Sequence, residues 1–175
     1  MLTVGHSNRA LADFLEMLKA HGVKVLVDVR TVPRSRYNPQ FNREALPQPL
    51  AAEGIEYIHL PGLGGLRHPH KDSRNTGWRN LSFRGYADYM QTAEFDKHLD
   101  ELLRLQDKHA AIMCAESVPW RCHRSMIADA LTARGIPVRH IMSVAKSTPH
   151  KLTAFARVEG TRVRYPSSDL ELFAE

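Results

Sequence analysis

The chain has 175 residues, 43% of them hydrophobic and 25% charged, and it carries a formal net charge of +5. This size and composition are those of a single globular domain with its own hydrophobic core, and they exclude a disordered or fibrous chain. No apolar run could span a bilayer and the first residues do not form a signal peptide, so we expect a cytoplasmic protein without membrane contact. The positive charge favours an anionic partner, although it would serve solubility equally well.

Strand and helix patterns alternate along the chain. Apolar or β-branched runs predict strands at residues 2–5, 24–29, 55–60, 110–115 and 137–142. Apolar residues at helical spacing predict helices at 10–20, 83–90, 95–105 and 125–134. A weak helical signal at 42–53 must be interrupted or delayed by Pro47 and Pro49. Ser7 or Asn8 can cap the first helix, and Gly135 can end the last one.

This alternation predicts an α/β fold. Strands that alternate with helices form a mainly parallel sheet with helices on both faces, so we expect one Rossmann-like, three-layer domain over residues 1–175, with about five core strands. Two short runs on either side of Glu159 and Gly160 predict a small C-terminal hairpin. Strand order stays open, because alternation permits more than one doubly wound topology.

Reactive side chains follow four of the predicted strands. They are His6 and Ser7, then Asp28 and Arg30, then His59, and finally Cys114 and Glu116. Because the carboxyl ends of parallel strands meet at one edge of a sheet, we expect a single cationic cleft there with Asp28 and Glu116 at its centre. Each residue also has a structural interpretation: either carboxylate could neutralise an arginine, Ser7 could be only a helix cap, and His59 is better interpreted as a packed histidine.

The connection at residues 113–124 is the most informative segment. It joins a predicted strand to a predicted helix and holds two thiols, Glu116, His123 and two arginines. The amino end of a helix attracts anions, so Arg124 at that position can grip a phosphate group. We therefore expect a working site in this connection.

The two cysteines are too few for a disulfide framework and fit a reducing compartment. Cys122, near the helix start and among basic neighbours, is the more nucleophilic candidate, whereas Cys114 can be a small buried hydrophobe. A bridge between them is conceivable, but no sequence pattern supports it. The spacing from Cys114 to Arg121 is longer than in cysteine-dependent phosphatases. A soft divalent metal is an alternative that these residues do not favour, because their spacing matches no paired-cysteine site.

Several motifs occur together between about residues 2 and 142. They are Val4-Gly5-His6-Ser7-Asn8, Asp28-Val29-Arg30, Pro33-Arg34-Ser35, Leu63-Gly64-Gly65, the segment from Phe83 to Met90, and Cys114-Ala115-Glu116 with Cys122-His123-Arg124. In combination they resemble the prokaryotic family of domain of unknown function 488 (DUF488), which leaves residues 143–175 as a C-terminal extension. The resemblance implies signature positions at His6, Ser7, Asp28, Arg30, Tyr86, Glu116, Cys122, His123 and Arg124, and it implies no particular activity.

The first functional hypothesis is a hydrolase-like enzyme acting on a phosphorylated small molecule, such as a nucleotide, or on nucleic acid. His6 and His123 would supply acid or base catalysis, with Asp28 and Glu116 orienting them or activating water. The substrate would be bound by Ser7, Arg30, Tyr86 and Arg124. No dinucleotide cofactor is expected, because the chain lacks the glycine fingerprint. The alternatives are a non-catalytic nucleic-acid-binding module and thiol or sulfur chemistry at Cys122 and Cys114.

Overall fold

A computed structural model describes residues 1–167 of the chain. Its strands are β1 (Leu2–Gly5), β2 (Val25–Asp28), β3 (Glu56–His59), β4 (Ala110–Cys114), β5 (Arg139–Ser143), β6 (Lys146–Pro149), β7 (Arg157–Glu159) and β8 (Arg162–Arg164). Its α-helices are α1 (Leu11–Ala20), α2 (Pro47–Ala52), α3 (Leu81–Tyr89), α4 (Ala93–Leu103) and α5 (Arg124–Ala133).

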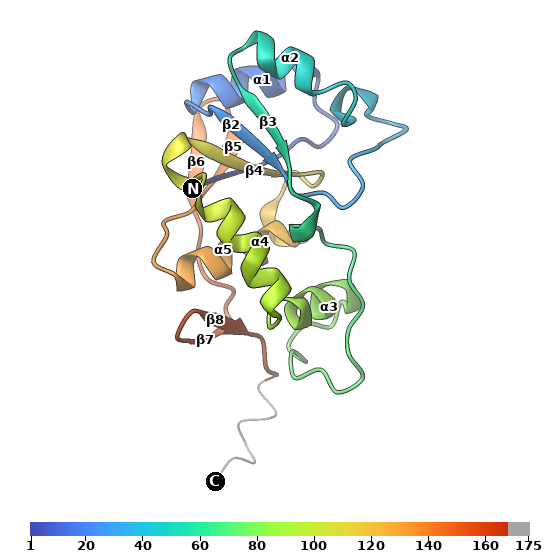
Figure 1. Cartoon of the computed structure of the whole chain (residues 1–175), viewed down its shortest axis with the longest axis vertical. Coiled ribbons are helices and arrows are strands. Elements are labelled where there is room, and N and C mark those ends of the chain that lie inside the picture. Colours follow the sequence, from blue (N-terminus) through green and yellow to red (C-terminus); the bar gives the residue numbers. More distant parts are fainter. Residues whose placement is uncertain (168–175) are drawn as a thin grey trace.

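Six strands form one sheet in the order β3-β2-β4-β1-β5-β6. The first five strands in the chain run parallel, and β6 pairs antiparallel with β5. The central strand is β4, which lies between β2 and β1 and is buried along its whole length. The hairpin of β7 and β8 forms a separate two-stranded sheet at the lower end of the molecule (Figure 1).

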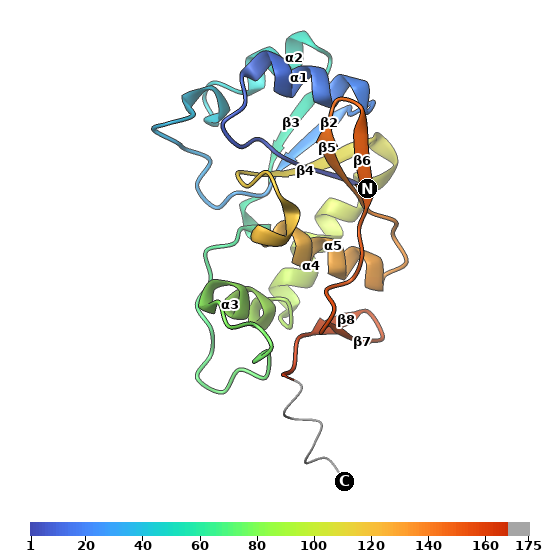
Figure 2. The same cartoon turned by 180° about the vertical axis from the view of Figure 1, so that it is seen from behind.

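Helices cover both faces of this sheet, which gives the predicted three-layer α/β fold (Figures 1 and 2). Successive residues of a strand point to opposite faces, so β4 contributes to two cores. Ala111 and Met113 pack with α1 and α2, whereas Ala110, Ile112 and Cys114 pack with α3, α4 and α5. Cys114 therefore ends its strand on the face that α5 covers.

The five predicted core strands are confirmed within about two residues at each end, and the C-terminal hairpin is confirmed with its first strand beginning at Arg157 where the run was predicted from Ala154. Strand β6 was not predicted. Its sequence, Lys146-Ser147-Thr148-Pro149, is polar and ends in proline, and it occupies the edge of the sheet, where one side of the strand makes no ladder. Such edge strands lack the apolar signal on which strand prediction depends.

The predicted helix ends were right in one case and wrong in another. Gly135 follows α5 with a φ of +76°, as expected of a glycine stop. The predicted cap on α1 was wrong, because Ala10 is the cap residue and no side chain bonds to the helix start. At α2 the prolines delay the helix, which was one of the two expectations, and do not interrupt it: the helix begins at Pro47, where the missing N–H is not needed.

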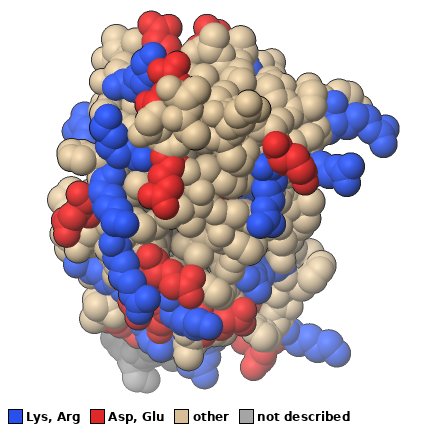
Figure 3. Space-filling view, turned by 45° about the horizontal axis from the view of Figure 1, so that its top comes forward, with Lys and Arg blue, Asp and Glu red and all other residues tan. Residues whose placement is uncertain are grey.

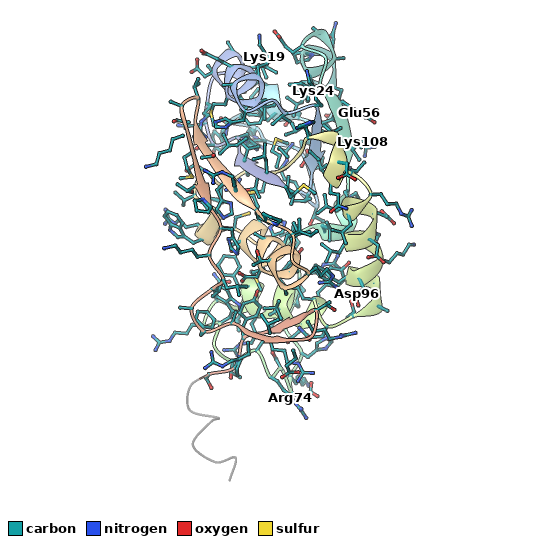
Figure 4. The ribbon with its side chains drawn as sticks, turned by 90° about the vertical axis from the view of Figure 1, so that its left-hand side faces the viewer. Lys19, Lys24, Glu56, Arg74, Asp96 and Lys108 are labelled. Atoms are coloured by element: carbon teal, nitrogen blue, oxygen red, sulfur yellow. The ribbon has the colours of Figure 1, made fainter. Side chains whose placement is uncertain are left out.

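The two ends of the parallel strands carry different groups. At the amino ends, Lys24 precedes β2 and Glu56 begins β3, with Lys108 nearby (Figure 4). The connections that follow β1, β2, β3 and β4 leave the sheet at the opposite, carboxyl edge. None of the helices within residues 1–167 is long and apolar enough to cross a membrane.

Candidate active site

Two adjoining cavities lie at the carboxyl edge of the parallel strands. One, of about 430 Å³, is lined by the residues that follow β1 and β2, and the other, of about 310 Å³, by those that follow β3 and β4 together with the start of α3. Four residues line both cavities: Arg30, Val32, Ala115 and Glu116. The two hollows therefore form one composite cleft, to which strands far apart in the sequence contribute.

Backbone hydrogen bonds hold the segment that follows β1 next to the segment that follows β4. The His6 and Ser7 amides donate hydrogen bonds to the carbonyls of Cys114 and Ala115, over 3.1 and 2.8 Å, which extends the β1–β4 ladder past the ends of both strands. Gly5 is required here because a Cβ atom would collide with the Glu116 carbonyl. Ser7 adopts a φ of +52°, a left-handed conformation that non-glycine residues seldom take outside sites under constraint.

Asp28 and Arg30 form a buried pair at the end of β2. The Arg30 guanidinium donates to both carboxylate oxygens, from Nε over 2.9 Å and from Nη2 over 2.6 Å, and Nη2 also donates to the Phe41 carbonyl over 2.6 Å. Tyr57 donates its hydroxyl to Asp28 over 2.7 Å. Asp28 is fully buried and Arg30 is only 8% exposed. Arg30, which was predicted to bind phosphate, is thus paired with Asp28, which was predicted to be a central carboxylate of the cleft.

His6 completes this cluster in a defined tautomer. Arg30 Nη1 lies 3.1 Å from Nε2, and because an arginine can only donate, Nε2 is the acceptor and Nδ1 donates to the Ser7 carbonyl over 2.7 Å. The ring stacks on Phe41 with centroids 4.3 Å apart. Burial, partly offset by the Ser7 carbonyl, lowers the pKa of His6 to about 4. Both nitrogens of this neutral ring are therefore already engaged.

Glu116 is the carboxylate that remains available. Its side chain is exposed, lines both cavities and forms no hydrogen bond or ion pair with any residue from 1 to 167. Arg34 in one cavity and Arg121 in the other are exposed cations, likewise without a side-chain partner in this part of the chain. On the face shown in Figure 3, basic and acidic side chains are interspersed, so these particular arginines matter more to the cleft than the total charge.

His123 lines the smaller cavity and is half-buried. Its Nδ1 lies 3.5 Å from Cys122 Sγ, its ring contacts that of Tyr86 at 5.1 Å, and its buried Nε2 has no hydrogen-bond partner within the described residues. Burial lowers the pKa of His123 to about 4, so the imidazole is neutral at pH 7. Among the four predicted catalytic residues, Glu116 has an exposed functional group without a partner in residues 1–167, His123 has a buried Nε2 without one, and His6 and Asp28 are fully engaged.

The two cysteines meet at the wall of the smaller cavity. Cys122 Sγ lies 2.7 Å from Cys114 Sγ, and both are free thiols. Burial raises the pKa of the Cys114 thiol, but the hydrogen bond from Cys122 and the positive charge of Arg124 outweigh it and lower the pKa. The same hydrogen bond, together with burial, raises the pKa of Cys122 well above its usual value. These directions are opposite to the sequence-based ranking, because contact between the thiols outweighs the basic neighbours of Cys122.

Arg124 and Tyr86, both predicted to bind substrate, are buried and are not among the lining residues of either cavity. Arg124 Nη2 donates to the carbonyls of Glu116 and Ser117 over 3.2 and 3.3 Å, which holds the loop after β4. Tyr86 donates its hydroxyl to the Leu63 carbonyl over 2.9 Å. In this structure both residues support the loops around the cleft. The predicted substrate contact at each position stays a prediction.

Sequence reasoning missed several residues of the cleft. Tyr57 and Phe41 hold Asp28, Arg30 and His6 in place, and Val32 and Leu66 line the cleft although they are 62% and 73% exposed. The partners of Asp28 come from other strands and loops and carry no motif of their own. An exposed apolar residue in a polar loop, such as Val32 or Leu66, is a signal that could have been used.

Residues 1–167 bring together no group of three or more histidine, cysteine or acidic side chains that could hold a metal ion.

The family model described as domain of unknown function DUF488 matches residues 10–131. The chain belongs to this family. The DUF488 match includes Asp28 and the loop from Glu116 to Arg124, while His6 and Ser7 precede it. No curated protein and no solved structure matches the chain.

Three histidines of this DUF488 chain whose pKa values are lowered predict a pH-dependent stability. Burial lowers the pKa of His6, His123 and His140 to about 4, whereas unfolding returns each to about 6.5. Between these values the unfolded chain binds protons that the folded chain does not, so stability falls as pH is lowered from about 6.5 to 4, by up to about 3 kcal/mol per histidine. Urea unfolding at pH 7, 6 and 5 should show this decline, and His140→Gln should reduce its slope. An unchanged slope in that variant would contradict the assignment for His140.

Proposed function

We propose that this protein is an enzyme that hydrolyses a phosphate-bearing substrate, a nucleotide or nucleic acid, in the composite cleft. The observation that carries the proposal is that Glu116, a carboxylate without a partner in residues 1–167, lines both cavities and shares one of them with neutral His123. Free acid or base groups in a cleft flanked by unpaired arginines are the arrangement that phosphate hydrolysis requires.

Binding would depend on Arg34 and Arg121. Because Arg30 is already neutralised by Asp28, it contributes little net charge to a ligand, whereas these two exposed arginines have no carboxylate partner among residues 1–167. Arginine binds phosphate oxygens through two parallel N–H groups, so one at each cavity can hold separate phosphates or a phosphate and its neighbour in a chain.

Catalysis would depend on His123 and Glu116. With a pKa near 4, His123 is unprotonated at pH 7 and would accept a proton from a water that reaches its ring at the cavity wall, and Glu116 would orient that water. The rate is then expected to fall as pH is lowered toward 4, where His123 takes up a proton. Buried His6 and Asp28 would hold Arg30 and the segment that follows β1 in position.

A non-catalytic nucleic-acid-binding module is the second candidate, and one observation favours it. Trp120 and Tyr37 are 66% and 89% exposed and lie in the two arginine-bearing loops. Exposed aromatic rings beside arginines are suited to stacking on the bases of a single strand. Other aromatic side chains are less available, since Tyr86 and Tyr89 are buried and Trp78 packs against Phe83 with ring centroids 5.0 Å apart.

The test combines binding and hydrolysis with one protein. A fluorescent single-stranded oligonucleotide and a labelled nucleoside triphosphate are titrated at two salt concentrations, and the same samples are assayed for released phosphate or shortened strand. We expect Arg121→Ala and Arg34→Ala to weaken binding and reduce its salt dependence. His123→Ala and Glu116→Gln should lower hydrolysis by about 10²–10⁴-fold with little change in binding.

Matched controls come from α1 and from the residue that follows α4. Glu16 and Arg104 are exposed and lie outside the cleft, so Glu16→Gln and Arg104→Ala should leave both readouts unchanged. Binding without hydrolysis under all conditions would reject the enzyme in favour of the binding module. Failure of both probes to bind would reject the two together.

A further inference from the structure

The thiol pair has a geometry that phosphate hydrolysis does not use. Cys114 and Cys122 are the only cysteines of the chain, and their sulfur atoms lie 2.7 Å apart at the wall of the smaller cavity. A disulfide bond is about 2.05 Å long, so a small side-chain movement would join them. Cys114 is held at the end of the central strand, and Cys122 follows the turn Pro119–Arg121, whose carbonyl at Pro119 accepts its amide hydrogen.

A buried positive charge lies beside this pair. Arg124 is 1% exposed, its Nε and Nη1 atoms have no hydrogen-bond partner, and it forms no ion pair with a carboxylate among residues 1–167. Leaving a guanidinium buried and unpaired is costly unless an anion is close. Arg124 lowers the pKa of Cys114, and the hydrogen bond from Cys122 acts in the same direction. Arg124 therefore favours the thiolate form of Cys114 over its thiol form.

We propose that Cys114 and Cys122 form a peroxide-reactive dithiol, in which Cys114 is the attacking thiolate and Cys122 the resolving thiol. The Cys114 sulfur attacks the terminal oxygen of a hydroperoxide, the O–O bond breaks, and the leaving alkoxide (hydroxide in the case of hydrogen peroxide) takes up a proton to become an alcohol or water. The sulfur of Cys122 then bonds to that of the Cys114 sulfenic acid, the S–O bond breaks, and the hydroxyl leaves as water with the proton of Cys122. The dithiol loses two electrons and the peroxide gains them.

A small oxidant fits this site better than a bulky one. Cys114 and Cys122 are only 1% and 6% exposed, and they meet a cavity of about 310 Å³ from its wall. Hydrogen peroxide can reach a sulfur placed in this way, whereas a low-molecular-weight disulfide must align both of its sulfurs with the attacking thiolate. The chemical class of the substrate is therefore a hydroperoxide, with hydrogen peroxide as its smallest member.

The experiment counts thiols in the reduced full-length protein after a short exposure to equimolar hydrogen peroxide. We expect both thiols to disappear together, the intact mass to fall by about 2 Da, and dithiothreitol to restore both. In Cys122→Ser the reaction should stop at Cys114, with a gain of about 16 Da and labelling by a sulfenic-acid reagent. In Cys114→Ser peroxide consumption should fall by about tenfold or more, because the attacking sulfur is gone and burial still raises the pKa of Cys122.

Serine is close to cysteine in size, and circular dichroism of both variants checks that they fold. Survival of both thiols in the native protein under peroxide that oxidises the urea-unfolded protein would overturn the proposal. So would an unchanged rate in Cys114→Ser, or a product in which the disulfide joins two chains. None of these readouts uses a phosphate-bearing substrate, so the result is independent of the proposed hydrolysis.

Discussion

Asp28→Ala is expected to lower the free energy of unfolding by about 3–5 kcal/mol, because it leaves the buried Arg30 guanidinium without its counter-charge. Arg30 is 8% exposed, and Asp28 is the only carboxylate paired with it among residues 1–167. The change also removes the acceptor of the Tyr57 hydroxyl. Urea unfolding at pH 7 measures the loss directly.

Tyr57→Phe is the matched control for this prediction. It removes one hydrogen bond to Asp28 and leaves the ion pair intact, so about 1–2 kcal/mol should be lost. A cost below about 1 kcal/mol for Asp28→Ala would show that Arg30 is satisfied without the carboxylate. In that case Arg30 would be free to hold a ligand anion, and its predicted role in phosphate binding would gain support.

The second large effect is expected at Asp129, which no motif indicated. Its fully buried carboxylate accepts hydrogen bonds from His150 Nε2 over 2.7 Å, from the Thr153 amide and hydroxyl over 3.1 and 2.7 Å, and from the Tyr165 hydroxyl over 2.8 Å. Asp129→Ala leaves these donors unsatisfied, at about 1–3 kcal/mol each before relaxation. We expect a total loss of about 3–5 kcal/mol in urea unfolding.

Asp129 joins α5 to the segment that follows β6, so the loss should also be local. Limited proteolysis of Asp129→Ala under native conditions should cut between residues 150 and 165, where the wild-type chain resists cleavage. Tyr165→Phe, which removes one of the four hydrogen bonds, should cost about 1–2 kcal/mol. Equal stability of wild type and Asp129→Ala would contradict a structural role for this carboxylate.

The same carboxylate begins a relay that reaches the centre of the sheet. Asp129 accepts from His150, so His150 Nδ1 accepts from His140 Nε2 over 2.9 Å, and His140 Nδ1 then accepts the Thr3 hydroxyl hydrogen over 2.7 Å. Each ring nitrogen and carboxylate oxygen of this relay takes part in a hydrogen bond. It ties the segment after β6 to β5 and β1, beyond the residues that match the family.

Periodicity and strand-end chemistry determined the α/β fold, its five parallel strands and the edge of the sheet at which the cleft lies. These features depend on local patterns, because an apolar run marks a strand wherever it pairs and parallel strands end at a common edge. Residue type alone also placed Glu116 and His123 at that edge.

Only the tertiary structure decided which of these groups are free. Asp28 and Arg30 lie two residues apart in the sequence, yet their mutual neutralisation depends on contacts from Phe41 and Tyr57, which come from other segments. The ranking of the two thiols changed for the same reason, because the hydrogen bond between Cys114 and Cys122 outweighs the charges adjacent in sequence. Burial and hydrogen-bond satisfaction are set by residues brought together in space, and no local pattern records them.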